Sequence, residues 1–265
     1  MRIISANLGH RTERTLDALA MLAPDVLCVQ EARSDPDWIR GLETELGMRA
    51  WVTPNPNNSK LCTGILVREA VFVDEPQLYP HAWSWHIPPT DLTIRLVDEP
   101  NTPWTVISTH HAYHSPHLRV LEAEDLLRAV DAAGRFGRQL VIAGDMNELP
   151  RRRFDGNVPD IDWGAVTDLA HRRHRAHHIN GTWFSATAVD DTLIDAGLVD
   201  AAVFVADRFD RPRVSATAGF DRPDQGGEAR IDRIYLTDSL ADKLYDCLVI
   251  DVGSDHQSVL IDLSN

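Results

Sequence analysis

Residues 139–147 read QLVIAGDMN, a short apolar run that ends in two polar side chains, Asp145 and Asn147. Because the run is short and aliphatic, residues 139–143 are predicted to form a buried strand. If the chain stays extended beyond it, Asp145 and Asn147 point to the same face. Polar groups exposed at the end of a rigid strand are typical of binding and catalytic sites in proteins that combine helices and strands.

The same arrangement recurs along the chain. The apolar runs IISAN, VLCVQE and TVISTH each end in a polar side chain, and the turn VGSDH places an Asp–His pair before the final apolar run. Taken alone, each residue has an ordinary explanation as a turn former or a structural histidine. Their recurrence at strand ends indicates one site, whose candidates are Asn7, Glu31, His110, Asp145, Asn147, Asp255 and His256.

Asp232 is a further candidate, because it lies inside the strand-like run ARIDRIYL between Ile231 and Ile234. An acidic side chain in such a run is costly to bury unless it is paired or bound to a metal. We therefore assign Asp232 to the same predicted site.

The pattern of apolar residues predicts an α/β protein. Several strands follow one another with few helices between them, which favours mixed or antiparallel sheets over a series of βαβ units. No repeat or linker interrupts the chain, so we expect a single domain over residues 1–265, with two sheets packed face to face and helices outside. Helices are predicted at 11–23, 35–46 and 117–136, and strands at 2–7, 26–30, 49–53, 61–68, 70–73, 92–97, 105–109, 139–143, 201–205, 231–237, 245–252 and 257–263.

The 265 residues include 26 Lys and Arg against 40 Asp and Glu, which gives a formal net charge of −14. This charge argues against a protein that coats nucleic acid through bulk charge, because neutralising phosphates requires Lys and Arg. It leaves room for an enzyme that cuts nucleic acid, since bound cations invert the charge of an acidic pocket.

The three cysteines lie far apart and show neither zinc-ligand spacing nor a disulfide framework. No run approaches the ~18 apolar residues of a membrane span. A strand-like run starts directly after Met1, so we expect no signal peptide. These features predict a reduced, cytoplasmic protein without a membrane partner. We also expect a monomer, although no feature of the sequence determines the oligomeric state.

The candidate residues form a hard, oxygen-rich set of ligands that also includes a His–Asp pair. Such a set suits Mg²⁺ or Mn²⁺ better than zinc, which prefers Cys and His. A divalent cation held in this way neutralises phosphate oxygens and stabilises a leaving oxyanion. A His–Asp pair adds a general base whose tautomer the carboxylate fixes.

The motifs ISAN, VQEA, STHH, GDMN, RIDRIY and SDH, in this order, resemble those of the endonuclease/exonuclease/phosphatase superfamily. That superfamily includes deoxyribonucleases, apurinic endonucleases, inositol polyphosphate 5-phosphatases and tyrosyl-DNA phosphodiesterases. The resemblance spans nearly the whole chain, from Asn7 to His256. It implies a DNase I-like, four-layer α/β/β/α sandwich and hydrolysis of phosphoester bonds with Mg²⁺ or Mn²⁺.

The resemblance also implies a role for each motif residue. Glu31 would be the main metal ligand, with Asn7 beside it and Asp255 near. Asp145 would orient or deprotonate the attacking water, and Asn147 would hold the water or a phosphate oxygen. His256 would contact the scissile phosphate or act as the base, and Asp232 would hydrogen-bond to it. His110 would support the phosphate or the leaving group. Whether Asp145 or His256 is the base stays open, and of the neighbours His110 and His111 we favour His110.

Substrate recognition is predicted from cationic and aromatic residues. The Arg151, Arg152 and Arg153 run follows the GDMN motif directly, and residues 171–178 form a second basic cluster, HRRHRAHH. Arginine binds phosphate through two parallel hydrogen bonds. Trp83 and Trp85, in a proline-rich segment, are candidates for stacking on bases. All of these residues have an ordinary alternative in solvated loops or core packing.

Several classes of function remain open. We favour a phosphodiesterase acting on nucleic acid, and a phosphatase of a small phosphoester such as a nucleotide or sugar phosphate is the alternative. A catalytically inactive binding relative would require a lost catalytic residue, whereas every motif position is filled. A zinc hydrolase has only the twelve histidines in its favour, and the chain lacks an H-E-x-x-H motif.

Overall fold

The computed structural model describes residues 1–265 apart from 10–12, 59, 82–84, 152–160, 213–214 and 265. Two six-stranded sheets of mixed direction dominate it, with the strand orders β13-β14-β1-β2-β4-β3 and β11-β12-β8-β7-β6-β5. The first sheet contains β1 (Arg2–Asn7), β2 (Val26–Ala32), β3 (Arg49–Thr53), β4 (Cys62–Val67), β13 (Leu244–Ile250) and β14 (Ser258–Leu263). The second contains β5 (Gln77–Tyr79), β6 (Thr90–Arg95), β7 (Pro103–His110), β8 (Gln139–Asp145), β11 (Val199–Asp200) and β12 (Asp232–Leu236).

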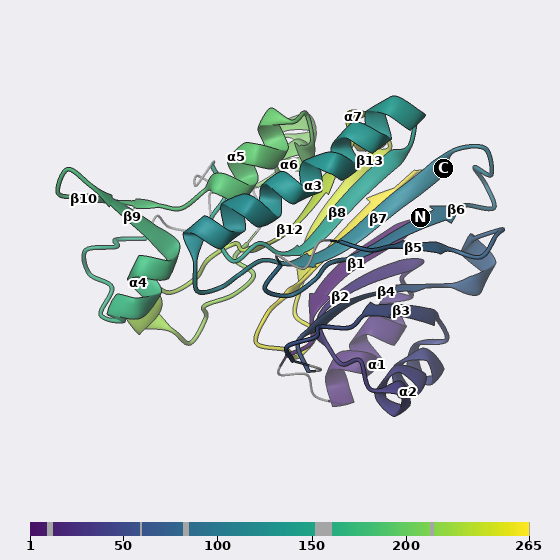
Figure 1. The fold of residues 1–265 in the computed structure, drawn as a ribbon, viewed down its shortest axis with the longest axis horizontal. Helices are drawn as coiled ribbons and strands as arrows, with labels where there is room; N and C mark the ends of the chain where they lie inside the picture. Colours follow the sequence, from purple (N-terminus) through teal and green to yellow (C-terminus); the bar gives the residue numbers. More distant parts are fainter. Residues whose placement is uncertain (10–12, 59, 82–84, 152–160, 213–214, 265) are drawn as a thin grey trace.

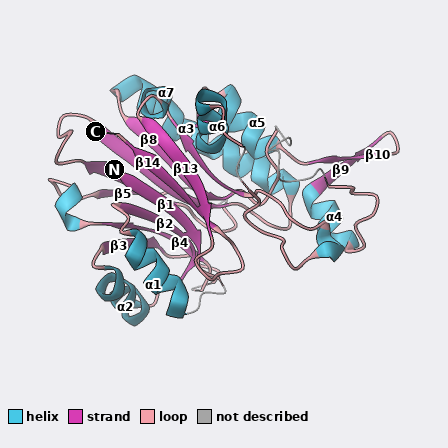
Figure 2. Cartoon of the chain, turned by 180° about the vertical axis from the view of Figure 1, so that it is seen from behind, coloured by secondary structure: helices cyan, strands magenta, loops and turns pink. Residues whose placement is uncertain are grey.

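Helices cover the outer faces of both sheets. In Figures 1 and 2, α1 and α2 lie on the first sheet, and α3 and α5 lie on the second. The helices are α1 (Glu13–Leu22), α2 (Pro36–Leu46), α3 (Pro116–Phe136), α4 (Leu169–Arg175), α5 (Ala188–Asp195), α6 (Ala201–Phe209) and α7 (Asp238–Ala241), with 3-10 turns at Glu69–Val71 and Pro223–Gln225. The predicted four-layer α/β/β/α sandwich is therefore confirmed. No helix in the described ranges is long and apolar enough to cross a membrane.

The alternation of side chains along each strand builds the layers. In β1, Ile3 packs into the core between the sheets, whereas Ile4 packs outward against α1 and α2. In β7, Val106 and Ile107 divide in the same way between the inter-sheet core and the α3 side. A strand with a period of two buries both faces only when both are apolar. These strands meet the condition because their sequences are continuous aliphatic runs.

The inter-sheet core changes from apolar to polar toward one end of the strands. Gln30 Nε2 donates to Ser108 Oγ across the two sheets at 3.1 Å, and Ser108 Oγ donates to the Val29 carbonyl at 2.9 Å. By alternation, Asn7 lies on the same face of β1 as Ile3 and Ser5, one step beyond this polar layer. The ends of the strands therefore deliver polar groups to the mouth between the sheets.

Two long helices begin and end where their capping residues stand. The Asp35 side chain accepts from Trp38 N at 2.9 Å and so caps the start of α2. Ser115 Oγ accepts from Leu118 N at 3.2 Å at the start of α3. Gly47 and Gly137 end the two helices in the left-handed conformation, with φ of 62° and 60°. Such caps satisfy backbone groups that the helix itself leaves unpaired.

Two predicted strands are wrong. Residues 201–205 form the first half of α6, because Asp200 caps its start by accepting from the backbone N–H of Ala202 and Val203. Ala201, Ala202 and Val205 of this helix close one edge of the inter-sheet core. In the predicted strand 70–73, residues 70 and 71 belong to a 3-10 turn, and Phe72 forms an isolated bridge with Leu96.

The polar segment after the GDMN motif holds structure that the sequence did not indicate. It contains α4 and a two-stranded hairpin of β9 (Ala176–Ile179) and β10 (Thr182–Ser185). Figure 1 shows these three elements together at one end of the sandwich, beyond the N-terminal end of α3.

Candidate active site

Three neighbouring strands bring three of the predicted residues into one row. Asp145, the last residue of β8, is the register partner of His110 on parallel β7 and of Asp232 on antiparallel β12. Side chains of directly paired residues point to the same face of a sheet. His110 Nε2 accordingly lies 3.5 Å from Asp145 Oδ2. A Cβ at Gly144 would lie 1.9 Å from the Thr109 carbonyl oxygen, so glycine is required for this close pairing of β7 and β8.

The other sheet contributes Asn7 and Glu31 from parallel strands β1 and β2. Asn7 Nδ2 lies 3.4 Å from both Glu31 Oε1 and Asp145 Oδ2, so one amide links carboxylates of the two sheets. The Asn7 side-chain oxygen accepts from Gly9 N at 3.0 Å. Asn7 therefore lies at the point where the two sheets meet at the mouth of the sandwich.

Backbone strain marks two of the predicted residues. Glu31 and Asn147 adopt positive φ angles of 54° and 53°, a region that side chains with a Cβ rarely occupy. Such conformations persist only where the surroundings enforce them, and they cluster at functional sites. The strain turns Glu31 out of the regular pairing of β2 with β4, whose register shifts between Val29 and Ala32.

His256 lies between two carboxylates. Its Nδ1 donates to Asp232 Oδ2 at 3.0 Å and lies 3.8 Å from Asp145 Oδ2. Burial alone would lower the pKa of His256, but Asp232, Asp145 and the adjacent Asp255 raise that pKa to about 10. The imidazole is therefore protonated at neutral pH.

The two buried carboxylates differ in their electrostatics. Burial would raise the pKa of Asp145, but His110, His256 and Arg175 hold it below the ordinary value. Burial and the charge of Asp145 raise the pKa of Asp232, despite its bond to His256. Asp145 is thus the carboxylate that stays ionised, whereas Asp232 has a raised pKa and accepts a hydrogen bond from His256.

Asn147 is fixed from three sides. Its backbone N–H donates to Asp145 Oδ1 at 2.8 Å, and its Nδ2 donates to the His111 carbonyl at 2.8 Å. Its Oδ1 accepts from Arg175 Nη2 at 2.5 Å. Arg175 was missed as an individual residue by sequence reasoning, which identified only the basic cluster 171–178. The basic cluster was visible in the sequence, but the sequence does not show which of its cationic side chains reaches the site.

His111 points away from this group. It is fully buried, with Nδ1 3.3 Å from Glu122 Oε2 and its ring 5.2 Å from that of Trp85. His110, rather than His111, lies beside Asp145. Asp255 is exposed next to Ser254, whose Oγ donates to the Asn7 carbonyl at 2.9 Å.

The two predicted substrate residues that the structure describes, Trp85 and Arg151, both have other partners. Trp85 is only 3% exposed, and its Nε1 donates to Asp125 Oδ2 at 2.9 Å, so the prediction that Trp85 stacks on substrate is wrong. Arg151 forms ion pairs with Asp191 and Asp195 of α5 instead of facing the catalytic group. The other three, Trp83, Arg152 and Arg153, lie outside the described residues.

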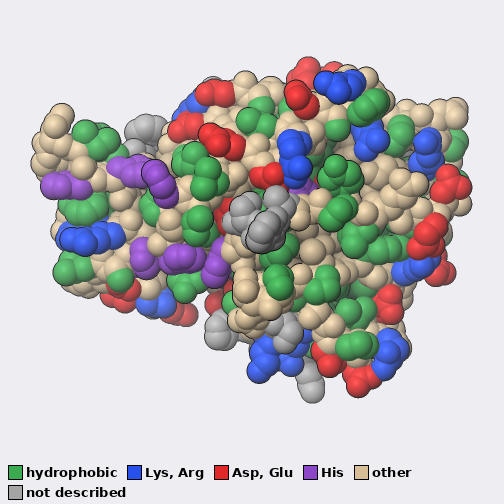
Figure 3. Space-filling view, viewed as in Figure 1, with side chains coloured by type: hydrophobic (Ala, Val, Ile, Leu, Met, Phe, Trp, Pro, Cys, Tyr) green, Lys and Arg blue, Asp and Glu red, His purple; other side chains and the backbone are tan. Residues whose placement is uncertain are grey.

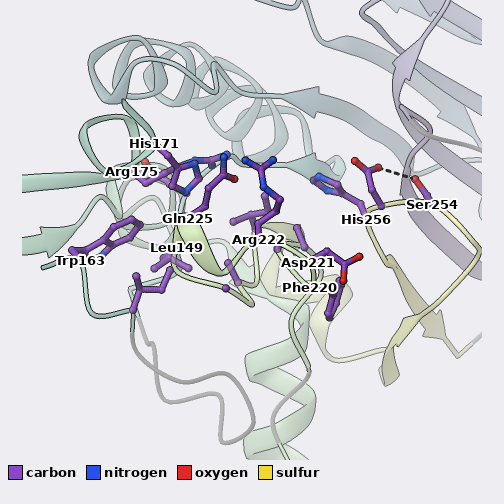
Figure 4. A pocket seen from close by; sticks show the side chains of 18 residues that line it. Leu149, Trp163, His171, Arg175, Phe220, Asp221, Arg222, Gln225, Ser254 and His256 are labelled. Carbon is purple, nitrogen blue, oxygen red and sulfur yellow. Dashed lines mark hydrogen bonds between the residues drawn. The ribbon is translucent and has the colours of Figure 1, made fainter. Parts of the chain in front are cut away.

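A cavity of about 340 Å³ opens beside His256. Figure 4 shows His256 at one end of it and Arg175, His171 and Trp163 at the other. Burial, together with the charge of Arg175, lowers the pKa of His171 to about 4. The His171 ring on the cavity wall is therefore neutral at neutral pH. The cavity thus combines apolar walls with cationic groups, among which Arg222 also lies.

The donor set fits a divalent cation. Asp145, Asp232 and His256 bring one potential ligand atom each within 4.8 Å of one another, a group that differs from the predicted ligands. Only the two carboxylates have lone pairs for a metal while His256 is protonated. The predicted main ligand, Glu31, is linked to this group through Asn7. Among the described residues, no cationic side chain forms an ion pair with Glu31. Oxygen-rich sites of this kind suit Mg²⁺ or Mn²⁺.

Carboxylates, histidines and an arginine thus gather around one mouth between the two sheets. The family model of the Endonuclease/Exonuclease/phosphatase family matches residues 4–256, and the chain belongs to this family. No curated protein gives a significant match.

Several solved structures share the fold. The 3'-5' exonuclease NExo from Neisseria meningitidis is 17% identical, with a TM-score of 0.66 and all of both chains covered. An AP endonuclease from Archaeoglobus fulgidus is 15% identical, with a TM-score of 0.65 and the same coverage. Truncated TDP2 from Caenorhabditis elegans is 15% identical, with a TM-score of 0.62, covering 100% of this chain and 97% of its own. At these identities the likeness concerns the fold.

Proposed function

We propose that the protein is a divalent-metal-dependent phosphodiesterase that hydrolyses nucleic acid by attack of water. The observation that carries the proposal is the row His110–Asp145–Asp232, with His256 hydrogen-bonded to Asp232 and Asn7 linking Asp145 to Glu31. This row gathers a base, a proton-bearing group and a metal ligand within one mouth, which is what hydrolysis of a phosphoester requires.

Glu31 would hold the Mg²⁺ or Mn²⁺ ion, with Asn7 and Asp255 as further oxygen donors. When bound, the ion would neutralise charge on the phosphate and on the departing oxygen. The site keeps Glu31 open to this role through its strained backbone and its position against Gly9.

Asp145 is our choice for the general base, because it stays ionised between His110, His256 and Arg175. It accepts a proton from water as the water oxygen forms its bond to phosphorus. The ester P–O bond breaks, and its electron pair leaves with the departing oxygen. His256, protonated and held by Asp232, donates a hydrogen bond to a phosphate oxygen. Asn147 orients the attacked group through its fixed amide.

The preference for nucleic acid has support on the other side of His110. Tyr113 is 53% exposed, with its ring 5.0 Å from that of His114, whose ring is 4.6 Å from that of His86. Burial and neighbouring histidines lower the pKa values of His86 and His174, so these rings are neutral. Neutral rings beside a phosphate site can stack on bases. Figure 3 shows histidines gathered at this end of the molecule. Two of the similar structures are those of an exonuclease and an AP endonuclease.

A phosphatase of a small phosphoester is the second candidate. Two observations favour it: the cavity of about 340 Å³, which suits one nucleotide-sized group, and the net charge of −14, which repels a polyanion.

A substrate panel tests both candidates. We would offer supercoiled plasmid, single-stranded oligonucleotide, abasic duplex, nucleotides and sugar phosphates, each with Mg²⁺, with Mn²⁺ and with EDTA. Glu31→Ala serves as the blank, and Arg173→Ala, on the exposed face of α4, serves as a surface control. Metal-dependent cleavage of a polynucleotide, absent in the blank, is the expected result. Release of phosphate from small esters with intact polynucleotides would instead establish the second candidate.

A further inference from the structure

Arg175 is the last residue of α4, and its guanidinium reaches back to the GDMN motif. Its Nη2 donates to Asn147 Oδ1 at 2.5 Å. Its Nη1 is buried and has no hydrogen-bond partner within the part of the chain that the structure describes. Figure 4 shows the side chain at the cavity beside His256. A charged donor is thus held at the site with one N–H group unused.

A buried arginine on α3 fixes the position of Arg175. Arg119 is completely buried, and its Nη2 donates to the His174 carbonyl at 2.6 Å, one residue before Arg175. Its Nη1 donates to the Ala112 carbonyl and its Nε to Glu148 Oε2, each at 2.9 Å. Arg119 therefore ties the end of α4 to the segments that follow His110 and Asn147. A donor held in this way needs no reorganisation during a reaction.

The surroundings of Arg175 favour an anion. Burial lowers the pKa of Arg175 to about 10, with Asp145 opposing the shift, so the group stays charged at neutral pH. Leaving a buried, charged donor unpaired is unfavourable unless a ligand satisfies it. The planar guanidinium matches the oxygens of a phosphate group.

We propose that Arg175 is a catalytic residue whose free Nη1 donates a hydrogen bond to a non-bridging oxygen of the scissile phosphate. Asn147 holds the guanidinium in place from the opposite nitrogen, and Arg119 holds the backbone that carries it. As water attacks phosphorus, negative charge grows on the non-bridging oxygens, and the bond from Arg175 strengthens. This inference rests on the proposed phosphoesterase function, and it extends to any substrate of that centre, because it concerns the phosphate alone.

The competing explanation is that Arg175 only orients Asn147. The two differ in one respect: a group that touches phosphate determines phosphate affinity and can be replaced by a free guanidinium ion. We would therefore compare wild type, Arg175→Ala and Arg175→Lys, with Arg173→Ala as the matched control on the same helix. The substrate would be bis(4-nitrophenyl) phosphate with Mn²⁺, and thermal melting would report folding.

We expect Arg175→Ala to lower kcat by ~10²–10³-fold, the usual effect of removing one preorganised donor. Arg175→Lys keeps the positive charge but lacks the paired N–H groups of a guanidinium, so its kcat should lie between those of wild type and Arg175→Ala. Added guanidinium chloride should raise the rate of Arg175→Ala and leave the control unchanged. Inorganic phosphate, titrated calorimetrically without metal, should bind Arg175→Ala more weakly than wild type.

Wild-type kcat and unchanged phosphate affinity in Arg175→Ala would overturn the inference. A loss of kcat that guanidinium does not restore, with unchanged phosphate affinity, would reduce Arg175 to a positioning residue and also overturn it. If Arg175→Ala does not fold, Arg175→Lys decides through the same two measurements. Asp145→Asn separates the two proposals: if it is inactive while Arg175→Ala is not, the proposed function stands without this inference. If wild type hydrolyses no ester, the phosphate titration still tests Arg175.

Discussion

Replacing Gly9 by alanine should disable the centre without unfolding the protein. A Cβ built on Gly9 would lie 2.2 Å from Glu31 Oε2, whereas ordinary contacts begin at 3.4 Å. The carboxylate must therefore move by 3.4 − 2.2 = 1.2 Å. The backbone at Gly9 is not left-handed, so alanine itself brings no conformational strain there.

The magnitude follows from this displacement. A misplacement of about 1 Å in a catalytic constellation can cost ~10²-fold in rate. Because Glu31 is the proposed metal ligand, we expect kcat/KM to fall by about that factor and the Mg²⁺ or Mn²⁺ concentration for half-maximal rate to rise. Stability should change little, since the atom that yields is the far end of a flexible side chain.

The assay is a metal titration of phosphodiester hydrolysis, run beside thermal unfolding. Gly41→Ala is the matched control, because a Cβ at Gly41 meets nothing within 4 Å. Gly41 lies inside α2, so this control should gain about 0.5–1 kcal/mol of stability and keep its activity. Unchanged metal dependence and rate in Gly9→Ala would refute the assignment of Glu31 as a ligand.

Three further perturbations test other parts of the molecule. Asp232→Asn removes a carboxylate that raises the pKa of His256, so kcat should fall ~10²–10⁴-fold and the alkaline limb of its pH profile should move to lower pH. Arg119→Met leaves Glu148 buried without its cation, and denaturant unfolding should report a loss of about 3–5 kcal/mol, against almost none for an exposed arginine. His81, buried between two carboxylates, has a raised pKa although burial opposes the shift. Its contribution is fully present below its ordinary pKa of 6.5 and is lost as pH rises through the higher folded-state value. His81→Asn should therefore destabilise the protein most at acid pH, and a deficit that grows with pH would contradict this reasoning.

The residues at the centre could be predicted because their signals are local. Asn7, His110 and Asp145 each end an apolar run, and the end of a strand is readable from the run itself. Asp232 could be found because an acidic residue between two isoleucines is costly to bury unless it is paired or bound to a metal. Parallel and antiparallel register then brought these ends together, as the layered architecture requires.

The failures share a different cause, which is dependence on distant partners. The run AAVFV at 201–205 has the composition of a strand, but Asp200 caps it as a helix and Arg230 pairs with Asp200 from another part of the chain. The sequence places Trp85 in a loop, but contacts with Asp125 and His111, which are distant in sequence, bury it. Arg175 stands in a run of cations that sequence cannot rank, and only Arg119 and Asn147 distinguish it.

The acidic charge of the whole chain and the chemistry of its centre are compatible because they act at different ranges. Exposed charges more than ~10 Å apart are largely screened at moderate salt, so a net charge of −14 acts mainly on the approach of a polyanion. Inside the mouth, the pKa of Arg175 falls only to about 10 and that of His256 rises to about 10, so both groups are cationic where solvent is excluded. Buried pairs are screened far less than exposed ones. A phosphate that reaches the mouth therefore meets two fixed cationic donors among carboxylates that the proposed metal ion would neutralise, so affinity depends on the centre and access depends on the surface.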